Sequence, residues 1–267
     1  MNFMVHFQIE PAVYKLQGLI KSGPYGMMIG SLKPSTKDPS ELGLSGEIYR
    51  FIHLDPNEPW FNSETKEEAS ENDLQEIQIP NHLLPGLKKI PFVFKPNEHE
   101  LWFVSSDRKN NLAPKSAAAF FERLFEHPEI QGKYPEIAVT ALPDKNSLDD
   151  MFATPVIDRL TIELKRPNAD DAGKHDEKFM KKLEKMHVRR QKTEYLAEKN
   201  SSIEPDNETK LLADIASKNG KVVIAGKNIQ GVSIEKSTED TPYLEPVLVN
   251  PETGSAVDTL RRVAGID

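Results

Sequence analysis

The sequence predicts an α+β protein with a mixed or antiparallel sheet and flanking helices, followed by a long basic helix and a C-terminal hairpin. Short apolar and aromatic runs are separated by turn-forming Pro, Gly and Asn, helical patterns fall between them irregularly, and the chain has no internal repeat. We expect an α+β core domain at residues 1–166 and a helical segment with a small C-terminal β-hairpin region at residues 167–267.

The first elements follow from apolar spacing and turn residues. Residues 3–9 predict a strand, and apolar residues at helical spacing after Pro11 predict a helix that reaches Ile20. The Gly-Pro-Tyr-Gly run at 23–26 ends that helix. Two further strands are expected at residues 27–32 and 46–54.

The middle of the chain carries the clearest hairpin pattern. Aromatic-rich runs at 90–94 and 101–104 flank a turn that contains Pro and Asn. A helix is expected from Pro114, with Ser116 as its N-cap and an apolar stripe that continues to Phe125. The next elements are a strand at 135–142, a short helix at 147–152 and a strand at 157–165.

The last third predicts mainly helix. A long helix is expected at about 176–198 and a second at 208–218, with Gly220 as a suitable C-terminal cap. Runs at 222–224 and 232–234 predict the final hairpin, and a short helix containing Arg261 and Arg262 ends the chain.

Charge is separated along the chain. The net charge of −8 argues against general binding of polyanions. The charge is unevenly distributed, however: residues 55–77 contain eight acidic side chains and a single basic one, Lys66. We interpret residues 55–76 as an exposed acidic loop. Residues 174–199 carry nine basic and five acidic side chains, which leaves room for a local anion-binding face.

The long basic helix is the leading candidate for a functional site. Five basic residues are spaced at i, i+4, i+7, i+11 and i+14, which places all of them within a narrow arc of one helix. An apolar stripe beside this arc can pack against the rest of the protein. A row of this kind can follow a phosphate backbone, and the alternative is an ordinary solvated helix face. The candidate nucleic-acid-binding residues are Lys178, Lys182, Lys185, Arg189 and Lys192.

A second pattern is typical of metal-dependent nucleases. Pro143-Asp144 precedes a strand that carries Glu163-Leu164-Lys165, which resembles their Pro-Asp…Glu-x-Lys signature. Asp144 and Glu163 would hold Mg²⁺ and Lys165 would steady the phosphate or activate water. Glu and Lys also alternate on the exposed faces of ordinary amphipathic strands, so the catalytic interpretation competes with a structural one.

Other chemistries lack their motifs in this sequence. The absence of Cys excludes thiolate catalysis and thiolate metal ligands, and no glycine-rich phosphate loop, His cluster or serine-nucleophile motif is present. We therefore expect no cofactor and no metal, and favour a non-enzymatic protein while leaving catalysis open. No signal peptide and no apolar run near membrane-spanning length is seen, which predicts a cytoplasmic protein without a membrane partner.

Several segments together resemble a known family. They are Gly46 to Phe51, Asp55 to Trp60, Leu112 to Pro114 with Phe120-Phe121, Arg159 to Leu164 with Arg166 to Asp171, and Asn219 to Val222. They resemble a bacterial family annotated only as a domain of unknown function, with members of about this length. The layout is also similar to lambdoid phage exclusion proteins of the RexA type and related phage-defence proteins, and that resemblance implies DNA binding.

Three functional hypotheses result. The first is a non-enzymatic, DNA-binding component of bacterial phage defence or of a mobile element, expected to be a homo-oligomer, with sequence-independent and salt-sensitive binding. The second is a protein-interaction module whose acidic loop at 55–76 meets a basic protein partner or mimics nucleic acid. The third is the Mg²⁺-dependent nuclease that would use Asp144, Glu163 and Lys165.

Overall fold

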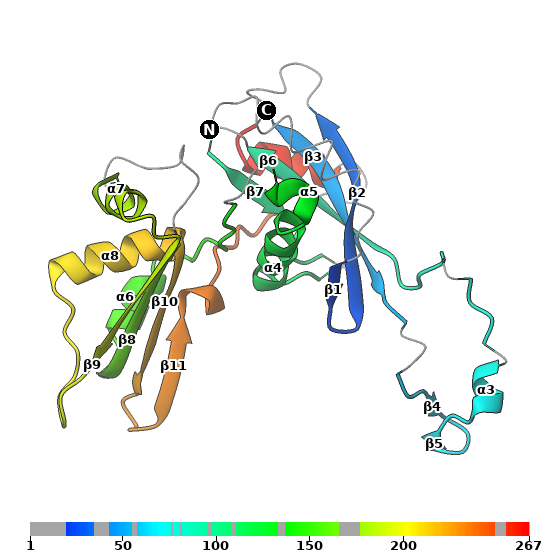
Figure 1. Cartoon of the computed structure of the whole chain (residues 1–267), viewed down its shortest axis with the longest axis horizontal. Helices are drawn as coiled ribbons and strands as arrows, with labels where there is room; N and C mark the ends of the chain where they lie inside the picture. Colours follow the sequence, from blue (N-terminus) through cyan, green and yellow to red (C-terminus); the bar gives the residue numbers. More distant parts are fainter. Residues whose placement is uncertain are drawn as a thin grey trace.

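The protein folds into two lobes, each built on an antiparallel sheet (Figure 1). The computed structural model describes residues 20–34, 43–54, 58–75, 77–80, 82–95, 98–107, 111–132, 137–165, 177–248 and 255–266. The predicted strand at 3–9 and most of the helix after Pro11 lie outside these residues. The α+β class is confirmed.

The first lobe contains a five-stranded sheet in the order β1-β2-β3-β6-β7, and every neighbouring pair is antiparallel. The strands are β1 (Ile20–Ser22), β2 (Tyr25–Pro34), β3 (Leu44–Ile52), β6 (Lys88–Lys95) and β7 (Glu100–Phe103). Ile20, expected in a helix, therefore begins a strand. The predicted Gly-Pro-Tyr-Gly break is the turn between β1 and β2, and Gly23 takes the positive φ of 57° that this turn requires.

Helix α4 (Pro114–Phe125) covers one face of this sheet. Its apolar stripe packs against alternate residues of the strands, such as Ile90 and Phe92 of β6. The rings of Phe92 and Phe121 pack edge-to-face, with 5.9 Å between their centroids. The expectation that Ser116 is the N-cap is wrong, because the N-cap is Ala113 and Pro114 occupies the first helical turn. Proline is favoured there, since the N–H it lacks has no helical partner anyway. A short helix, α5 (Pro128–Gln131), follows.

The opposite face of the first sheet receives the end of the chain. Val93, which alternates with Phe92 along β6, packs with Leu260, Ala264 and Ile266 of helix α9 (Ala256–Val263) and the residues after it. The C-terminal helix expected from the sequence is thus confirmed, and it closes the lobe in which the described chain begins (Figure 1).

The long connection between β3 and β6 leaves the body of the molecule as an extended arm (Figure 1). It carries a two-residue ribbon of β4 (Phe61–Asn62) and β5 (Glu67–Glu68) and a short helix, α3 (Glu71–Gln75). Exposure of the acidic loop is confirmed for most of its described residues, but the segment is not irregular throughout.

The second lobe contains a four-stranded antiparallel sheet in the order β11-β10-β8-β9. Its strands are β8 (Val156–Lys165), β9 (Arg190–Leu196), β10 (Gly220–Lys227) and β11 (Ser233–Ser237). The helices α6 (Ser147–Phe152), α7 (Glu177–Lys185) and α8 (Asn207–Lys218) share one core with alternate residues of these strands, including Leu160, Ile162 and Ile224. The predicted final hairpin is confirmed as β10 and β11, joined to β8 in one sheet.

Two further expectations are wrong. Residues 137–142 form no strand, and only an isolated bridge between Pro143 and Pro242 follows them. Gly220 is not the helix cap: Asn219 caps α8, and Gly220 starts β10. A Cβ at Gly220 would collide with the backbone carbonyl oxygen of Glu163, so the close approach of β10 to β8 requires glycine here.

Ion pairs connect the two lobes through α4. Lys165 at the end of β8 binds Glu122 with 2.7 Å between Nζ and Oε1, and Lys115 lies 3.5 Å from Glu239 in the short 3₁₀ helix η1 (Thr238–Asp240). The predicted division after residue 166 falls between β8 and β9, which pair over seven residues. Among the described residues, no helix has the length and apolar character needed to cross a membrane.

Candidate nucleic-acid interface

Helix α7 ends much earlier than the sequence predicts. The N–H of Val188 donates to the carbonyl of Leu183, and the N–H of His187 donates to that of Glu184. His187 has a φ of 55°. This combination is a Schellman motif, in which a left-handed residue stops the helix and an apolar residue beyond it packs back on the last turn. Val188 and Leu183 make that apolar contact in the core of the second lobe.

The expected helix at 176–198 is therefore wrong beyond Lys185, and its second half is the edge strand β9. Lys182 and Lys185 lie in the last turn of α7, Arg189 in the connection, and Lys192 in β9. Lys178 lies in α7, but its side chain is outside the described part of the structure. The five predicted cations thus do not form one row along a helix, although they remain on one continuous helix–turn–strand segment.

Four of these cations share one property: their side chains are exposed and make no ion pair within the residues that the structure describes. We call Lys182, Lys185, Arg189 and Lys192 the cationic surface. Glu184 and Glu194 are the acidic residues among them, and both are also exposed. Exposed ammonium and guanidinium groups without internal partners are free to exchange solvent counterions for phosphate oxygens.

Neighbouring cations on the same sheet are, by contrast, neutralised. Arg190 places its Nη2 2.6 Å from Oε2 of Glu163, a carboxylate only 5% exposed. Arg159 binds Glu235 at 3.1 Å, and Lys165 binds Glu122 as described above. In the strand register, Lys192 lies opposite Glu163 on the face of the sheet turned away from the helices. The carboxylate of Glu163 is already held by Arg190, which leaves Lys192 exposed.

The three candidate nuclease residues have different environments. Glu163 is engaged by Arg190 and Lys165 by Glu122, so each would have to release a partner before it could act on a metal or a phosphate. Asp144 accepts a hydrogen bond from the N–H of Asn146 and lies in the turn before α6. Over the described chain, no group of three or more His, Asp or Glu side chains is arranged to hold a metal ion.

Asp144 instead belongs to an acidic neighbourhood around Tyr243. The hydroxyl of Tyr243 donates to Glu245 at 2.8 Å, and this bond raises the pKa of the tyrosine above its ordinary value of 10.0, with smaller contributions from burial and from the charges of Asp144 and Glu100. The ring of Trp102 meets that of Tyr243 edge-to-face at 6.0 Å. The arrangement ties residues 243–245 to the first lobe.

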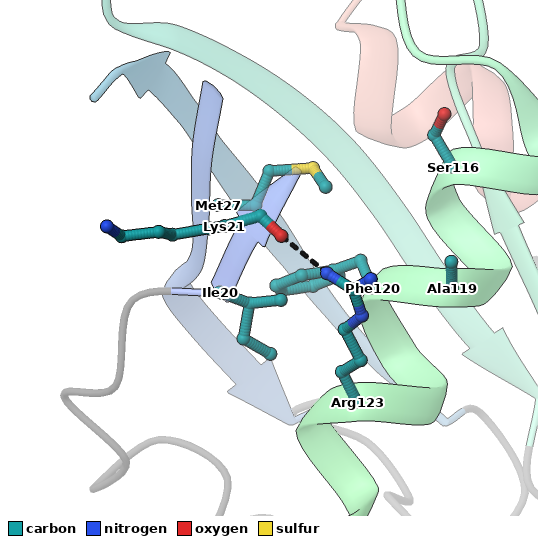
Figure 2. A pocket seen from close by; sticks show the side chains of 7 residues that line it. All are labelled: Ile20, Lys21, Met27, Ser116, Ala119, Phe120 and Arg123. Carbon is teal, nitrogen blue, oxygen red and sulfur yellow. Dashed lines mark hydrogen bonds between the residues drawn. The ribbon is translucent and has the colours of Figure 1, made fainter. Parts of the chain in front are cut away.

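A small hollow lies between β1, β2 and α4 (Figure 2). Its volume is about 40 Å³, and the apolar side chains of Ile20, Met27 and Phe120 are among those that line it. Arg123 also lines the hollow and donates to the backbone carbonyl of Lys21 at 2.6 Å. Ligand pockets usually measure roughly 300–1,000 Å³, so this hollow is far too small for a metabolite or cofactor.

The acidic arm is the second feature with a clear chemical character. Between residues 58 and 75 it carries six acidic side chains and one lysine, and Phe61 in β4 is 71% exposed. Ser70 and Asp73 cap α3 reciprocally: Oγ of Ser70 accepts from the N–H of Asp73, and Oδ2 of Asp73 accepts from the N–H of Ser70 at 2.8 Å. That backbone hydrogen bond lowers the pKa of Asp73, helped by bonds from the hydroxyl of Ser70 and from Asn62.

Sequence reasoning missed two features of this region. It missed the buried carboxylate of Glu163 and its ion pair with Arg190. That pair can be predicted only when the register between β8 and β9 is known. It also missed the edge strand itself. The available signal was the alternation from Arg190 to Leu196, with the strand-favouring Thr193 and Tyr195 at alternate positions.

These observations define an α+β protein of two antiparallel-sheet lobes with an exposed cationic surface on an edge helix and strand. The chain belongs to the family described as Domain of unknown function (DUF4747), which it matches over residues 8–265. No curated protein matches the chain.

Proposed function

We propose that the protein binds DNA without catalysis, through phosphate contacts made by the cationic surface. The observation that carries the proposal is a contrast within the second lobe: Lys182, Lys185, Arg189 and Lys192 are exposed and unpaired within the described residues, whereas Arg159, Lys165 and Arg190 are bound to carboxylates. The unpaired cations lose no internal partner when a phosphate binds, so the release of counterions is available to drive association.

Binding of this kind depends on charge and not on base sequence. The four cations belong to a short segment with two intervening glutamates, so a small number of phosphates is neutralised at once. Each neutralised phosphate contributes about −0.9 to the slope of log K against log salt for duplex DNA, and about −0.7 for single strands. Three to four contacts therefore predict a slope of roughly −3 for a duplex.

The test is fluorescence anisotropy of labelled duplex and single-stranded DNA, titrated with the whole chain at several salt concentrations. We expect binding at low salt, little dependence on base sequence, and the slope given above. Absence of binding to both forms of DNA at the lowest salt concentration would end the proposal.

A role in phage defence follows as a second step of the same proposal. It is supported by the similarity of layout to phage exclusion proteins together with the cationic surface. If the role is correct, cells that express the protein restrict plaque formation by susceptible phages, and changing Lys182, Lys185 and Arg189 to Glu removes that restriction. Restriction by the wild type and the variant alike would separate defence from DNA binding.

A second candidate function belongs to the acidic arm. Its charge, its exposed Phe61 and its reach away from the body support contact with a basic protein partner, and complementary charge would speed that encounter. Changing Phe61 to Ala and Glu67 and Glu68 to Lys should abolish capture of such a partner while leaving DNA affinity unchanged. A partner that is captured equally by this variant binds elsewhere.

A further inference from the structure

Strand β9 is an open edge of the second sheet. It pairs with β8 through seven consecutive positions, from Lys165 opposite Arg190 to Arg159 opposite Leu196, without a bulge. No other described strand pairs with its outer side. The strand contains no proline, and Leu196 at its end is 69% exposed. A regular, unpaired edge of this length is a template for pairing with another strand.

The charges of β9 are arranged so that a second copy of the same strand fits beside it. In a symmetric dimer two antiparallel copies meet around a two-fold axis, so one residue faces itself and its neighbours pair reciprocally. With Thr193 on the axis, Lys192 of each copy lies opposite Glu194 of the other. Arg190 lies opposite Leu196, whose exposed side chain the arginine stem can cover, and Gln191 lies opposite Tyr195.

Adjacent symmetric registers are less favourable. Moving the axis to Lys192 brings the two Lys192 side chains face to face, and moving it to Glu194 brings the two carboxylates together. Like charges directly opposite each other destabilise a strand pair. Centring on Gln191 sets Arg190 against Lys192, again with like charges. Of these registers, the one centred on Thr193 pairs all seven residues of β9, sets Lys192 opposite Glu194 and brings no like charges together.

We propose that the protein forms a homodimer through β9, with Thr193 on the two-fold axis and reciprocal Lys192–Glu194 ion pairs, so that the two four-stranded sheets become one sheet of eight strands. The interface is small compared with the roughly 1,200–2,000 Å² of stable complexes, so the dimer dissociates on dilution. The inference rests on the geometry of β9 and does not require DNA binding. Lys192 belongs to both proposals, so in the dimer the phosphate contacts rest on Lys182, Lys185 and Arg189.

Charge exchange tests the register. We expect sedimentation velocity of the whole chain to show a dimer whose population rises with concentration. Lys192→Glu alone and Glu194→Lys alone each place like charges opposite each other twice, and should weaken the dimer by about tenfold or more. The double variant Lys192→Glu with Glu194→Lys restores opposite charges and should restore the dimer. Circular dichroism confirms that each variant is folded.

Cross-linking tests the axis without changing any charge. The chain has no Cys, so a single introduced cysteine can form a disulfide only between copies. Directly opposite residues in an antiparallel pair have Cα atoms about 4.5–5.5 Å apart, within the range of a disulfide. Thr193→Cys should therefore give a covalent dimer on mild oxidation, whereas Lys199→Cys, exposed but outside the strand, should not.

Three results would overturn the proposal. One is a monomer at every concentration tested. Another is a dimer that both single charge variants leave intact. The third is failure of the charge-exchanged double variant, shown to be folded, to recover the dimer that the single variants lose. Loss of DNA binding alone bears on the cationic surface and leaves the dimer inference standing.

Discussion

At the scale of single residues, the pair of Glu163 and Arg190 carries the largest expected electrostatic effect. Removing one partner of a buried ion pair leaves the other charge uncompensated, which costs about 3–5 kcal/mol when both are buried. Glu163 is 5% exposed but Arg190 is 58% exposed, so solvent screens part of this cost. We expect Arg190→Ala to lower the free energy of unfolding by about 2 kcal/mol, measured by urea denaturation.

The matched control for this prediction is Lys192→Ala, two residues along the same face. Lys192 is exposed and has no ion pair in the described chain, so its loss should change the free energy of unfolding by less than about 0.5 kcal/mol. Equal effects of the two substitutions would contradict the role assigned to Glu163.

His187 offers a second test at this scale. It holds the left-handed conformation that ends α7, with a φ of 55°, where glycine carries no steric penalty. His187→Gly should therefore stabilise the protein by about 0.5–1 kcal/mol, and His187→Val should destabilise it by at least about 1 kcal/mol, because a β-branched residue resists positive φ. Opposite signs in thermal unfolding would argue that α7 continues past Lys185.

Asp206 connects residue and element, because it caps α8. Its carboxylate accepts a hydrogen bond from the N–H of Thr209 at 2.8 Å, and this bond lowers the pKa of Asp206 below its ordinary value of 3.8. A lowered folded-state pKa stabilises the protein above the unfolded value, and this stabilisation is lost as pH falls through the folded value.

The expected result is a pH-dependent difference between two proteins. Asp206→Ala should lower the midpoint of thermal unfolding at pH 7, and the difference from wild type should shrink below about pH 4 as the wild-type carboxylate becomes protonated. A difference that is constant from pH 7 to pH 3 would mean that the carboxylate does not act as the cap.

At the scale of elements, the close approach of β10 to β8 makes Gly220 the position most sensitive to an added methyl group. A Cβ there meets the carbonyl oxygen of Glu163, so the strands must separate. Gly220→Ala should cost at least about 3 kcal/mol or prevent folding, whereas Gly23→Ala, at a positive φ with open space around it, should cost only about 1 kcal/mol. Similar stability of both variants would refute the tight packing of β10.

The sequence predicts an element well when the residues that determine it are contained within the element, and poorly when it depends on pairing with a distant segment. Local patterns locate β6, β7 and α8, because turn residues and apolar spacing are contained within each segment. The end of α7 is not predictable in the same way. Its stop residue is His187 instead of glycine, and the segment beyond it keeps a helix-compatible spacing of cations while its partner, β8, lies some thirty residues earlier.

The candidate site shows the same limit. The sequence identifies the residue types of the cationic surface, but the narrow arc it predicts requires a helix that continues past Lys185, where α7 ends. Sequence spacing also could not distinguish Arg190, which is bound to Glu163, from Lys192, which is free within the described chain. That distinction depends on cross-strand register.

At the scale of the whole molecule, the acidic arm is separable from both lobes. None of its described residues belongs to a core cluster, and the N–H of Ile52 donates to the carbonyl of Pro85 at 2.9 Å, so the two ends of the arm already meet. Replacing residues 54–84 by a short Gly-Ser linker should leave the midpoint of thermal unfolding within a few degrees of wild type. A large drop would show that the arm supports the fold.

DNA binding by the cationic surface is tested most directly by a matched pair of charge-reversal variants. One variant changes Lys182, Lys185 and Arg189 to Glu; the other changes Lys33, Lys199 and Lys227, which are exposed elsewhere, and alters the net charge equally. In DNA titrations at low salt, we predict that the first variant loses most of its binding. The slope of its log K against log salt becomes shallower by about two to three units, while the second variant stays near wild type. Equal loss in both variants, or unchanged binding by the first, would show that these three residues do not form the DNA-binding surface.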